Sequence, residues 1–276
     1  MAEVVIIGAA RTPMGGFQGV FSGIPAAELG GAAIAAALES AATPAERVEE
    51  LIMGCVLPAG QGQAPARQAG FRGGLGPEVP ATTLNKMCGS GMKAVMIAHD
   101  QIALGATGIM VAGGMESMTE SPYLLPKMRA GARIGHGQVI DHMFLDGLED
   151  AYDKGRLMGT FAEDCAEKYR FTREEQDDYA LISLTNALAA QANGAFDGEI
   201  AAVSVPTKSG EVSIGADEQP TKARPDKIPT LKPAFRKGGT VTAANSSSIS
   251  DGAAALVLAS RGRSEERRVG KECRSR

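Results

Sequence analysis

The stretch ATTLNKMCGSGMKAVMIAHDQIALGATGIMVAGG, residues 81–114, predicts a strand, a turn, a long helix and a second strand in succession. The residues before Cys88 lead into the turn, and apolar residues then recur at helical spacing over 89–104. Residues 108–112 form a short apolar run that a Gly-Gly pair stops, which is typical of a buried strand. Strands that alternate with helices indicate an α/β fold with parallel strands.

The same alternation begins at the start of the sequence. Residues 4–7 predict a strand, residues 26–40 a helix rich in Ala and Leu, and residues 48–56 form another short apolar run. A short helix is expected over residues 65–71. The α/β region therefore extends from residue 4 to residue 114.

A long segment, residues 117–233, interrupts the alternation. One helix stands out there, because Thr172 and Glu175 form a capping-box pattern at its start. Long excursions between two strands usually cover an active site or bind substrate. Residues 240–244 and 253–259 then predict a return to core strands.

Composition and charge exclude several classes of protein. The chain has 276 residues, of which 44% are hydrophobic and 22% charged, as in an ordinary soluble enzyme. The formal net charge of −4 argues against a nucleic-acid partner. No run reaches the roughly 18 apolar residues of a membrane-spanning helix, and no basic region precedes the first apolar run. We therefore expect neither a nucleic-acid partner nor a membrane.

The cysteines and histidines give no sign of a metal site. The four cysteines lie far apart without a CxxC pair, so we expect no disulfide framework, no metal, and a reducing, cytoplasmic setting. We interpret Cys55 and Cys165 as small buried hydrophobic residues. His99 is expected as a packing or partly exposed helix residue, and His136 and His142 as surface residues.

The segment RSEERRVGKECRSR, residues 263–276, differs in character from the rest. It contains six basic and three acidic residues and lacks the apolar periodicity that would bury a face. The string resembles an in-frame translation of a sequencing adapter, so we expect the native sequence to end near Arg261 or Gly262. The alternative is a solvated charged tail or the start of a surface helix.

Residues 85–94, NKMCGSGMKA, resemble the nucleophile motif of the thiolase family. Four further blocks agree with the family in order and spacing, and the match covers nearly all of residues 1–262. Within the family, the sequence is most similar to bacterial acetyl-CoA acetyltransferases. The four blocks are GAARTP at 8–13, AGGMESM at 112–118, MGTFAE at 158–163, and GTVTAAN with DGA at 239–253.

The resemblance implies the layered αβαβα fold of thiolases, with two similar halves and a loop domain inserted in the first. Four segments are then expected, and the second half of the fold is missing. Thiolases are usually homodimers or homotetramers, so a homo-oligomer is also implied. The segments are an N-terminal α/β core (1–116), an inserted CoA-binding loop domain (117–238), a return to the core (239–262) and a non-native tail (263–276).

The resemblance further implies an acyltransferase that uses coenzyme A and acyl-CoA as substrates, without a covalently bound cofactor. The reaction is the Claisen condensation of two acetyl-CoA to acetoacetyl-CoA, and the reverse thiolysis, through a thioester on Cys88. Thiolases take a catalytic His, a second Cys and a water-holding Asn from GHP, CxGGG and NEAF motifs, which do not occur in this sequence. We therefore expect the chain as written to lack turnover. Alternatives are a 3-ketoacyl-CoA thiolase of fatty-acid β-oxidation, or a non-catalytic thiolase-like protein that binds acyl-CoA or lipid.

Physical chemistry also favours a reactive Cys88. A thiolate is a good nucleophile and a good leaving group, but a free Cys, with a pKa of about 8.5, needs help near neutral pH. The N–H groups at the start of the expected helix would stabilise a thiolate and contribute to an oxyanion hole. Gly89 and Gly91 would let the acyl chain approach the backbone.

Substrate contacts are assigned by resemblance alone. Ser247 matches a residue that contacts pantetheine, and Ala243 and Phe235 match positions that line the same channel. Leu157 and Met158 match a stretch at the acyl end of the substrate. Many short-chain relatives have His-Met there, so one hydrogen-bonding contact is absent from this chain.

Basic residues are expected near the adenine and phosphates of CoA. Arg224 and Lys222 fall where the family has a basic residue, and the segment with Lys127, Arg129 and Arg133 would attract an anionic cofactor. The alternative for each is solvated surface charge.

Overall fold

The computed structural model describes residues 2–265. The chain forms two compact units. The core unit contains the chain up to Glu120, Asp197–Ala216, and the chain from Ser250, and the inserted unit contains Ser121–Phe196 and Asp217–Ile249. The division differs from the expected insertion of 117–238, because the chain returns to the core unit at 197–216.

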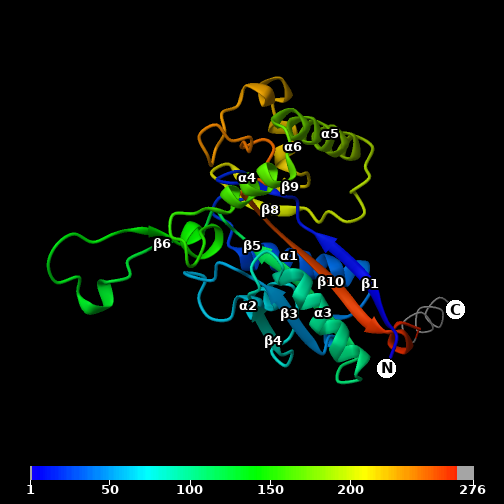
Figure 1. The fold of residues 1–276 in the computed structure, drawn as a ribbon. Coiled ribbons are helices and arrows are strands. Elements are labelled where there is room, and N and C mark those ends of the chain that lie inside the picture. Colours follow the sequence, from blue (N-terminus) through cyan, green and yellow to red (C-terminus); the bar gives the residue numbers. More distant parts are fainter. Residues whose placement is uncertain (1, 266–276) are drawn as a thin grey trace. The chain divides into compact units, whose positions relative to one another are not determined.

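A mixed β-sheet forms the centre of the core unit (Figure 1). The parallel strands β4, β3 and β5 form one side, and β10 runs antiparallel between β5 and β1. The expected α/β fold with parallel strands is confirmed, as are the strands expected within 4–7, 108–112 and 253–259. In spatial order the strands are β1 (Val4–Arg11), β10 (Ser250–Ser260), β5 (Ile109–Glu116), β3 (Glu50–Gly54) and β4 (Ala81–Leu84), with β2 (Gly15–Gly16) paired to β10.

Helices cover both faces of this sheet. Successive side chains of a strand point to opposite faces, and the strands carry apolar side chains on both. Leu51 and Val111 belong to a buried cluster with α1 (Ala26–Ser40) and α2 (Pro65–Arg72). Ile52 and Met110, one residue along each strand, belong to a second cluster with α3. That helix spans Ser90–Ala103. The expected helices at 26–40, 65–71 and 89–104 are thus confirmed within a residue at each end.

The hairpin of β8 (Val203–Thr207) and β9 (Gly210–Ile214) belongs to the core unit. Val203 and Val205 are buried in one cluster with Phe21 and other apolar residues before and within α1. Burial of this apolar strand face explains why 197–216 leaves the inserted unit. The sequence pattern hid it, because the strand alternates apolar and polar residues over only a few positions.

Most of the regular elements of the inserted unit are helices. Its longest helix, α5, begins as expected, because the Thr172 side chain accepts a hydrogen bond from Glu175 N (3.2 Å) and the Glu175 carboxylate accepts one from Thr172 N (2.7 Å). Among residues 2–265, no helix is long and apolar enough to cross a membrane. The elements are β6 (Tyr123–Leu124), η2 (Met128–Ala130), β7 (Ile140–Asp141), the π-helix η3 (Phe144–Leu148), α4 (Met158–Tyr169), α5 (Arg173–Ala192), α6 (Glu218–Lys222) and η4 (Pro225–Thr230).

The strand expected at 240–244 is wrong, because this segment is irregular and belongs to the inserted unit. Side chains take up its backbone donors where a neighbouring strand would otherwise do so. The carboxylate of Glu163 accepts the N–H groups of Thr240 and Val241, each at 2.9 Å, and Asn245 Oδ1 accepts Thr242 N–H at 2.6 Å.

A short helical segment follows β10, and residues 261–265 form it. Arg261 pairs with Glu3, and the guanidinium holds the pKa of that exposed carboxyl below its usual value. The rest of the expected non-native tail, residues 266–276, lies outside the described residues.

Candidate active site

Cys88 is an exposed thiol in the turn between β4 and α3. Gly89 is the N-cap of the helix, and the first helical hydrogen bond runs from Lys93 N to Gly89 O (2.9 Å). The thiol therefore precedes the positive end of a 14-residue helix by two positions.

The turn before the helix is closed by its own residues. Met87 adopts a left-handed backbone with φ of +49°, which is unfavourable for a residue with a side chain. The buried hydroxyl of Ser90 accepts Lys86 N–H (2.8 Å) and donates to Met87 O (2.6 Å). These two hydrogen bonds join Ser90, which follows Cys88, to two residues that precede it, and so fix the backbone of the turn.

Small residues let the start of α3 sit directly on the sheet. A Cβ added at Gly54 of β3 would lie 2.7 Å from the Ser90 Cβ and 2.8 Å from Gly91 N. Gly91 in turn faces the backbone of Gly113 in β5. The close approach explains these glycines and anchors the N-terminus of α3 at the carboxyl ends of the parallel strands.

Cys55 and Cys165 differ from each other. Cys55 is buried, as expected, and burial together with the charge of Glu116 raises the pKa of its thiol to about 12. Cys165 is exposed on α4, so the prediction that it is buried is wrong. The buried positions of that helix are instead Glu163 and Ala166.

His136 is exposed as expected, whereas His99, expected as a packing or partly exposed residue, is exposed on α3. His99 lies 3.1 Å from the Asp100 carboxylate. The expectation of a surface position is wrong for His142, which is buried with its Nδ1 2.6 Å from the Asp146 carboxylate. Within residues 2–265, no group of three or more His, Cys, Asp or Glu side chains is arranged to hold a metal ion.

The expected substrate residues all belong to the inserted unit, whereas Cys88 belongs to the core unit. Leu157 is the N-cap of α4, and Met158 is the first residue of that helix. The ring of Phe235 lies over the adjacent Gly159, because a Cβ added there would be 2.3 Å from the ring. The structure thus brings Phe235 to the beginning of α4.

Ala243 and Ser247 are exposed on the irregular segment that precedes β10. Buried acidic side chains hold this segment. Besides Glu163, Asp177 of α5 accepts a hydrogen bond from Asn245 Nδ2 (2.9 Å), and Asp177 also pairs with Arg173 (2.7 Å). The backbone around Ala243 and Ser247 is therefore fixed to both α4 and α5.

The charged residues of the expected CoA site are exposed. Arg224 immediately precedes η4, and Lys222 pairs with the buried carboxylate of Glu218. Lys127, Arg129 and Arg133 are exposed between β6 and β7.

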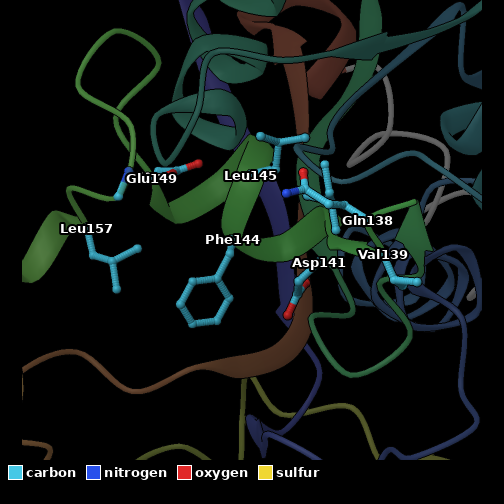
Figure 2. Close-up of a pocket in the computed structure, with 9 residues that line it drawn as sticks. Gln138, Val139, Asp141, Phe144, Leu145, Glu149 and Leu157 are labelled. Atoms are coloured by element: carbon cyan, nitrogen blue, oxygen red, sulfur yellow. Dashed lines mark hydrogen bonds between the residues drawn. The ribbon is translucent and has the colours of Figure 1, made fainter. Parts of the chain in front are cut away.

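A cleft of about 660 Å³ lies within the inserted unit, beside the π-helix (Figure 2). Leu157 contributes to its wall together with Phe144 and Leu145, and Asp141 and Glu149 supply carboxylates. π-Helical turns occur frequently at functional sites. Leu157 is the one expected substrate residue that lines this cleft.

Sequence reasoning assigned no structural role to two side chains, Asn85 before Cys88 and Glu116 at the end of β5. Asn85 Oδ1 accepts Met87 N–H at 2.9 Å, a local pattern typical of Asn in turns, so its type and spacing carried a signal. Glu116 contacts the loop after β3 across 60 positions of sequence, and no local pattern indicates such a contact.

Comparison with known proteins gives a consistent result. Residues 4–262 match the model of the thiolase N-terminal domain. The chain is 52% identical over 262 residues to acetyl-CoA acetyltransferase 2 of Arabidopsis thaliana and 49% identical over 262 residues to an acetyl-CoA acetyltransferase of Pseudomonas aeruginosa. Each match covers 94% of this chain, which spans 64% and 66% of those proteins.

A solved structure is also similar. The crystal structure of Acat5 thiolase from Ascaris suum in complex with coenzyme A matches with a TM-score of 0.89 and 38% sequence identity. The match covers 96% of this chain and 68% of that one.

Proposed function

The chain belongs to the thiolase family, and we propose that the whole protein is an acetyl-CoA C-acetyltransferase that uses Cys88 as its nucleophile. The Cys88 thiolate attacks the carbonyl of acetyl-CoA, and the CoA thiolate leaves, so that an acetyl thioester forms on Cys88. The α-carbon of a second acetyl-CoA, after loss of a proton to a base, attacks this thioester. Acetoacetyl-CoA forms and the Cys88 thiolate leaves; thiolysis is the reverse.

The observation that carries the proposal is the exposure of Cys88 at the turn before α3. An exposed sulfur can be reached by an acyl-CoA, as nucleophilic attack on its carbonyl requires. Cys55 offers the contrast, because burial and a neighbouring carboxylate keep it a thiol.

The substrate is proposed from the relatives. The curated relatives are named for acetyl-CoA, and the similar solved structure holds coenzyme A. In this chain we assign the substrate contacts to residues of the inserted unit, which serves as the CoA-binding loop domain. The support is the exposed position of Ser247 and Ala243 on a fixed segment, and of Arg224 before η4. The remaining contacts are Phe235, Met158 and Leu157.

The proposed nucleophile is tested by incubation of the protein with acetyl-CoA and mass spectrometry of the cysteine peptides. We expect one acetyl group on the Cys88 peptide, removed by neutral hydroxylamine as a thioester. Cys165 is the matched control, because it is also an exposed thiol but lies on α4. Equal acetylation of both cysteines, or acetylation that persists in Cys88→Ser, would contradict the proposal.

The 3-ketoacyl-CoA thiolase alternative has one feature in its favour. Leu157 offers a hydrocarbon side chain to a cleft whose wall includes Phe144 and Leu145. Rates of Cys88 acylation measured for acyl-CoA donors of increasing chain length separate the two. A preference for acetyl-CoA supports the acetyltransferase, and a preference for long chains supports the thiolase of fatty-acid β-oxidation.

The setting of the protein is proposed as well. The spacing of the cysteines supports a reducing, cytoplasmic location. Family membership supports a dimer or tetramer and a role in fatty-acid metabolism. Light scattering of the purified protein measures the oligomeric state directly.

A further inference from the structure

We propose that Asp177 is a positioning residue that holds two separate segments of the proposed CoA site. One segment carries Ala243 and Ser247, and the other carries Arg224. The inference rests on the proposed assignment of these three residues to CoA. Asp177 acts through the two segments rather than by contact with the substrate.

Asp177 is an unusual residue for a helix to bury. The structure describes all 20 residues of α5, and among them Asp177 alone is buried, at 5% exposure. A helix normally turns apolar side chains to the interior, and a carboxylate out of water is costly unless partners surround it. Each oxygen of Asp177 has such a partner. Oδ1 accepts a hydrogen bond from Asn245 Nδ2 (2.9 Å), and Oδ2 accepts one from Arg173 Nε (2.7 Å).

Through Asn245, the carboxylate of Asp177 holds the turn around Ala243. Asn245 Oδ1 accepts the N–H group of Thr242 at 2.6 Å, and Thr242 is fully buried. The hydroxyl of Thr242 in turn accepts the N–H group of Asn245 at 3.3 Å. Ala243 therefore lies between two residues that fix each other, and Ser247 follows two positions after Asn245.

Through Arg173, the same carboxylate holds η4. The Nε of Arg173 donates to Asp177, and its Nη2 donates to Ile228 O at 2.9 Å. Ile228 is the buried residue of η4, and Arg224 is the N-cap of that helix. Both α6 and η4 contact α5, beside which α6 is drawn in Figure 1. Two nitrogens of one guanidinium thus connect the segment of Arg224 to Asp177.

The charge of Asp177 separates positioning from direct electrostatics. CoA is an anion, so removal of a negative charge from the protein favours its binding. Loss of a positioning contact acts in the opposite direction, because two segments that were fixed must then be ordered when CoA binds. The sign of the change in affinity therefore shows which effect operates.

The test measures the dissociation constants of CoA, and of pantetheine, by calorimetry in the 276-residue chain. The variants are Asp177→Asn, Asn245→Ala and Arg173→Lys. Lysine keeps a positive charge beside the carboxylate, but one nitrogen replaces the two that reach Asp177 and Ile228. Asp178→Asn is the matched control, because it removes the same charge from the next residue of α5, which is exposed.

We expect Asp177→Asn to weaken the binding of CoA and of pantetheine about threefold to tenfold. Asn245→Ala should weaken both, because it releases the segment proposed to contact pantetheine. Arg173→Lys should weaken the binding of CoA alone, because pantetheine lacks the adenine and phosphates to which Arg224 is assigned. Affinity for CoA in Asp177→Asn that equals or exceeds that of Asp178→Asn overturns the inference.

Hydrogen exchange without ligand, followed by mass spectrometry, tests the two connections directly. We expect faster exchange over residues 240–247 in Asn245→Ala, over residues 225–231 in Arg173→Lys, and over both in Asp177→Asn. Exchange that is equally faster throughout the inserted unit in every variant would show a general loss of stability and overturn the inference. If Asp177→Asn does not fold, the other two variants decide the matter.

The exchange pattern is independent of the proposed reaction, since it uses no CoA. The expected pattern in a protein that neither binds CoA nor is acylated by acetyl-CoA would sustain the role of Asp177 in holding both segments and reject the proposed function. Acylation of Cys88 with the same exchange pattern and CoA affinity in all variants would do the reverse.

Discussion

The ring of Phe235 lies against Gly159 so closely that a Cβ on residue 159 would be 2.3 Å from it. Gly159 is the second residue of α4 and follows Met158. Phe235 and Met158 are both proposed to contact the substrate. Phe235 can therefore occupy its position only because residue 159 of α4 is a glycine.

Gly159→Ala should therefore displace Phe235. We expect a loss of about 1–3 kcal/mol in the free energy of unfolding, as is common when a methyl group is added to a packed site. We also expect weaker CoA binding in calorimetry, with acetylation of Cys88 retained at saturating acetyl-CoA. Gly137→Ala is the control, since an added Cβ meets nothing within 4 Å there. Equal effects of both substitutions would contradict the argument.

Glu163→Gln should loosen the segment that carries Ala243 and Ser247. Glu163 is only 3% exposed, and its two oxygens accept the N–H groups of Thr240 and Val241. An amide leaves one of these groups facing a donor, which costs about 1–3 kcal/mol. Chemical denaturation measures the loss.

The exposed Glu167 of the same helix supplies the control for that change, because it pairs only at the surface with Arg236 (3.1 Å). Glu167→Gln should change the free energy of unfolding by less than about 1 kcal/mol. A Glu163→Gln protein as stable as Glu167→Gln would show that the segment is held by other contacts.

Cys55 should make the protein less stable in alkali. Burial raises its pKa to about 12 in the folded state, well above that of a free thiol, so between the two values the folded chain keeps a proton that the unfolded chain releases. The stability contributed by the neutral thiol is complete below the pKa of a free thiol, about 8.5, and declines as the pH rises towards 12, by at most about 1.4 kcal/mol per pH unit.

Denaturation curves between pH 8 and about 11 check this dependence. Cys55→Ala should give a shallower fall of the free energy of unfolding with pH than the unsubstituted protein. Cys165→Ala, at an exposed thiol, should leave the slope unchanged. If the free energy of unfolding falls equally steeply with pH in all three proteins, the raised pKa of Cys55 is not the cause of the fall.

Local patterns were sufficient for most of the core unit. Helix α1 matches the expected residues 26–40, because Ala and Leu follow one helical period. In the inserted unit, a local capping box of Thr172 and Glu175 likewise marked the start of α5. For the segment 240–244, the same reasoning gave a wrong prediction. Its Thr and Val residues resemble a strand, but its donors are satisfied by Glu163, which lies almost 80 residues earlier.

The candidate site divides in the same way. Cys88 was identifiable, because its neighbours along the chain form the strand-to-helix turn and carry the family motif. The hydrogen bonds from the loop after β3 to Glu116 were not predictable, because they depend on the pairing of β3 with β5. His142 and Cys165 were misjudged for a related reason, since burial within the inserted unit follows long-range packing rather than residue type.

The 276-residue chain should accept an acetyl group without turning over. Formation of the thioester requires the Cys88 thiolate, whereas condensation also requires a base for the α-proton, and the GHP and CxGGG motifs that supply base and acid in thiolases do not occur in this sequence. We expect acetyl transfer to Cys88 but no steady-state thiolysis of acetoacetyl-CoA with CoA. Loss of the acetoacetyl-CoA absorbance that is sustained over many turnovers, and abolished in Cys88→Ser, would mean that residues of this chain supply the missing base and acid.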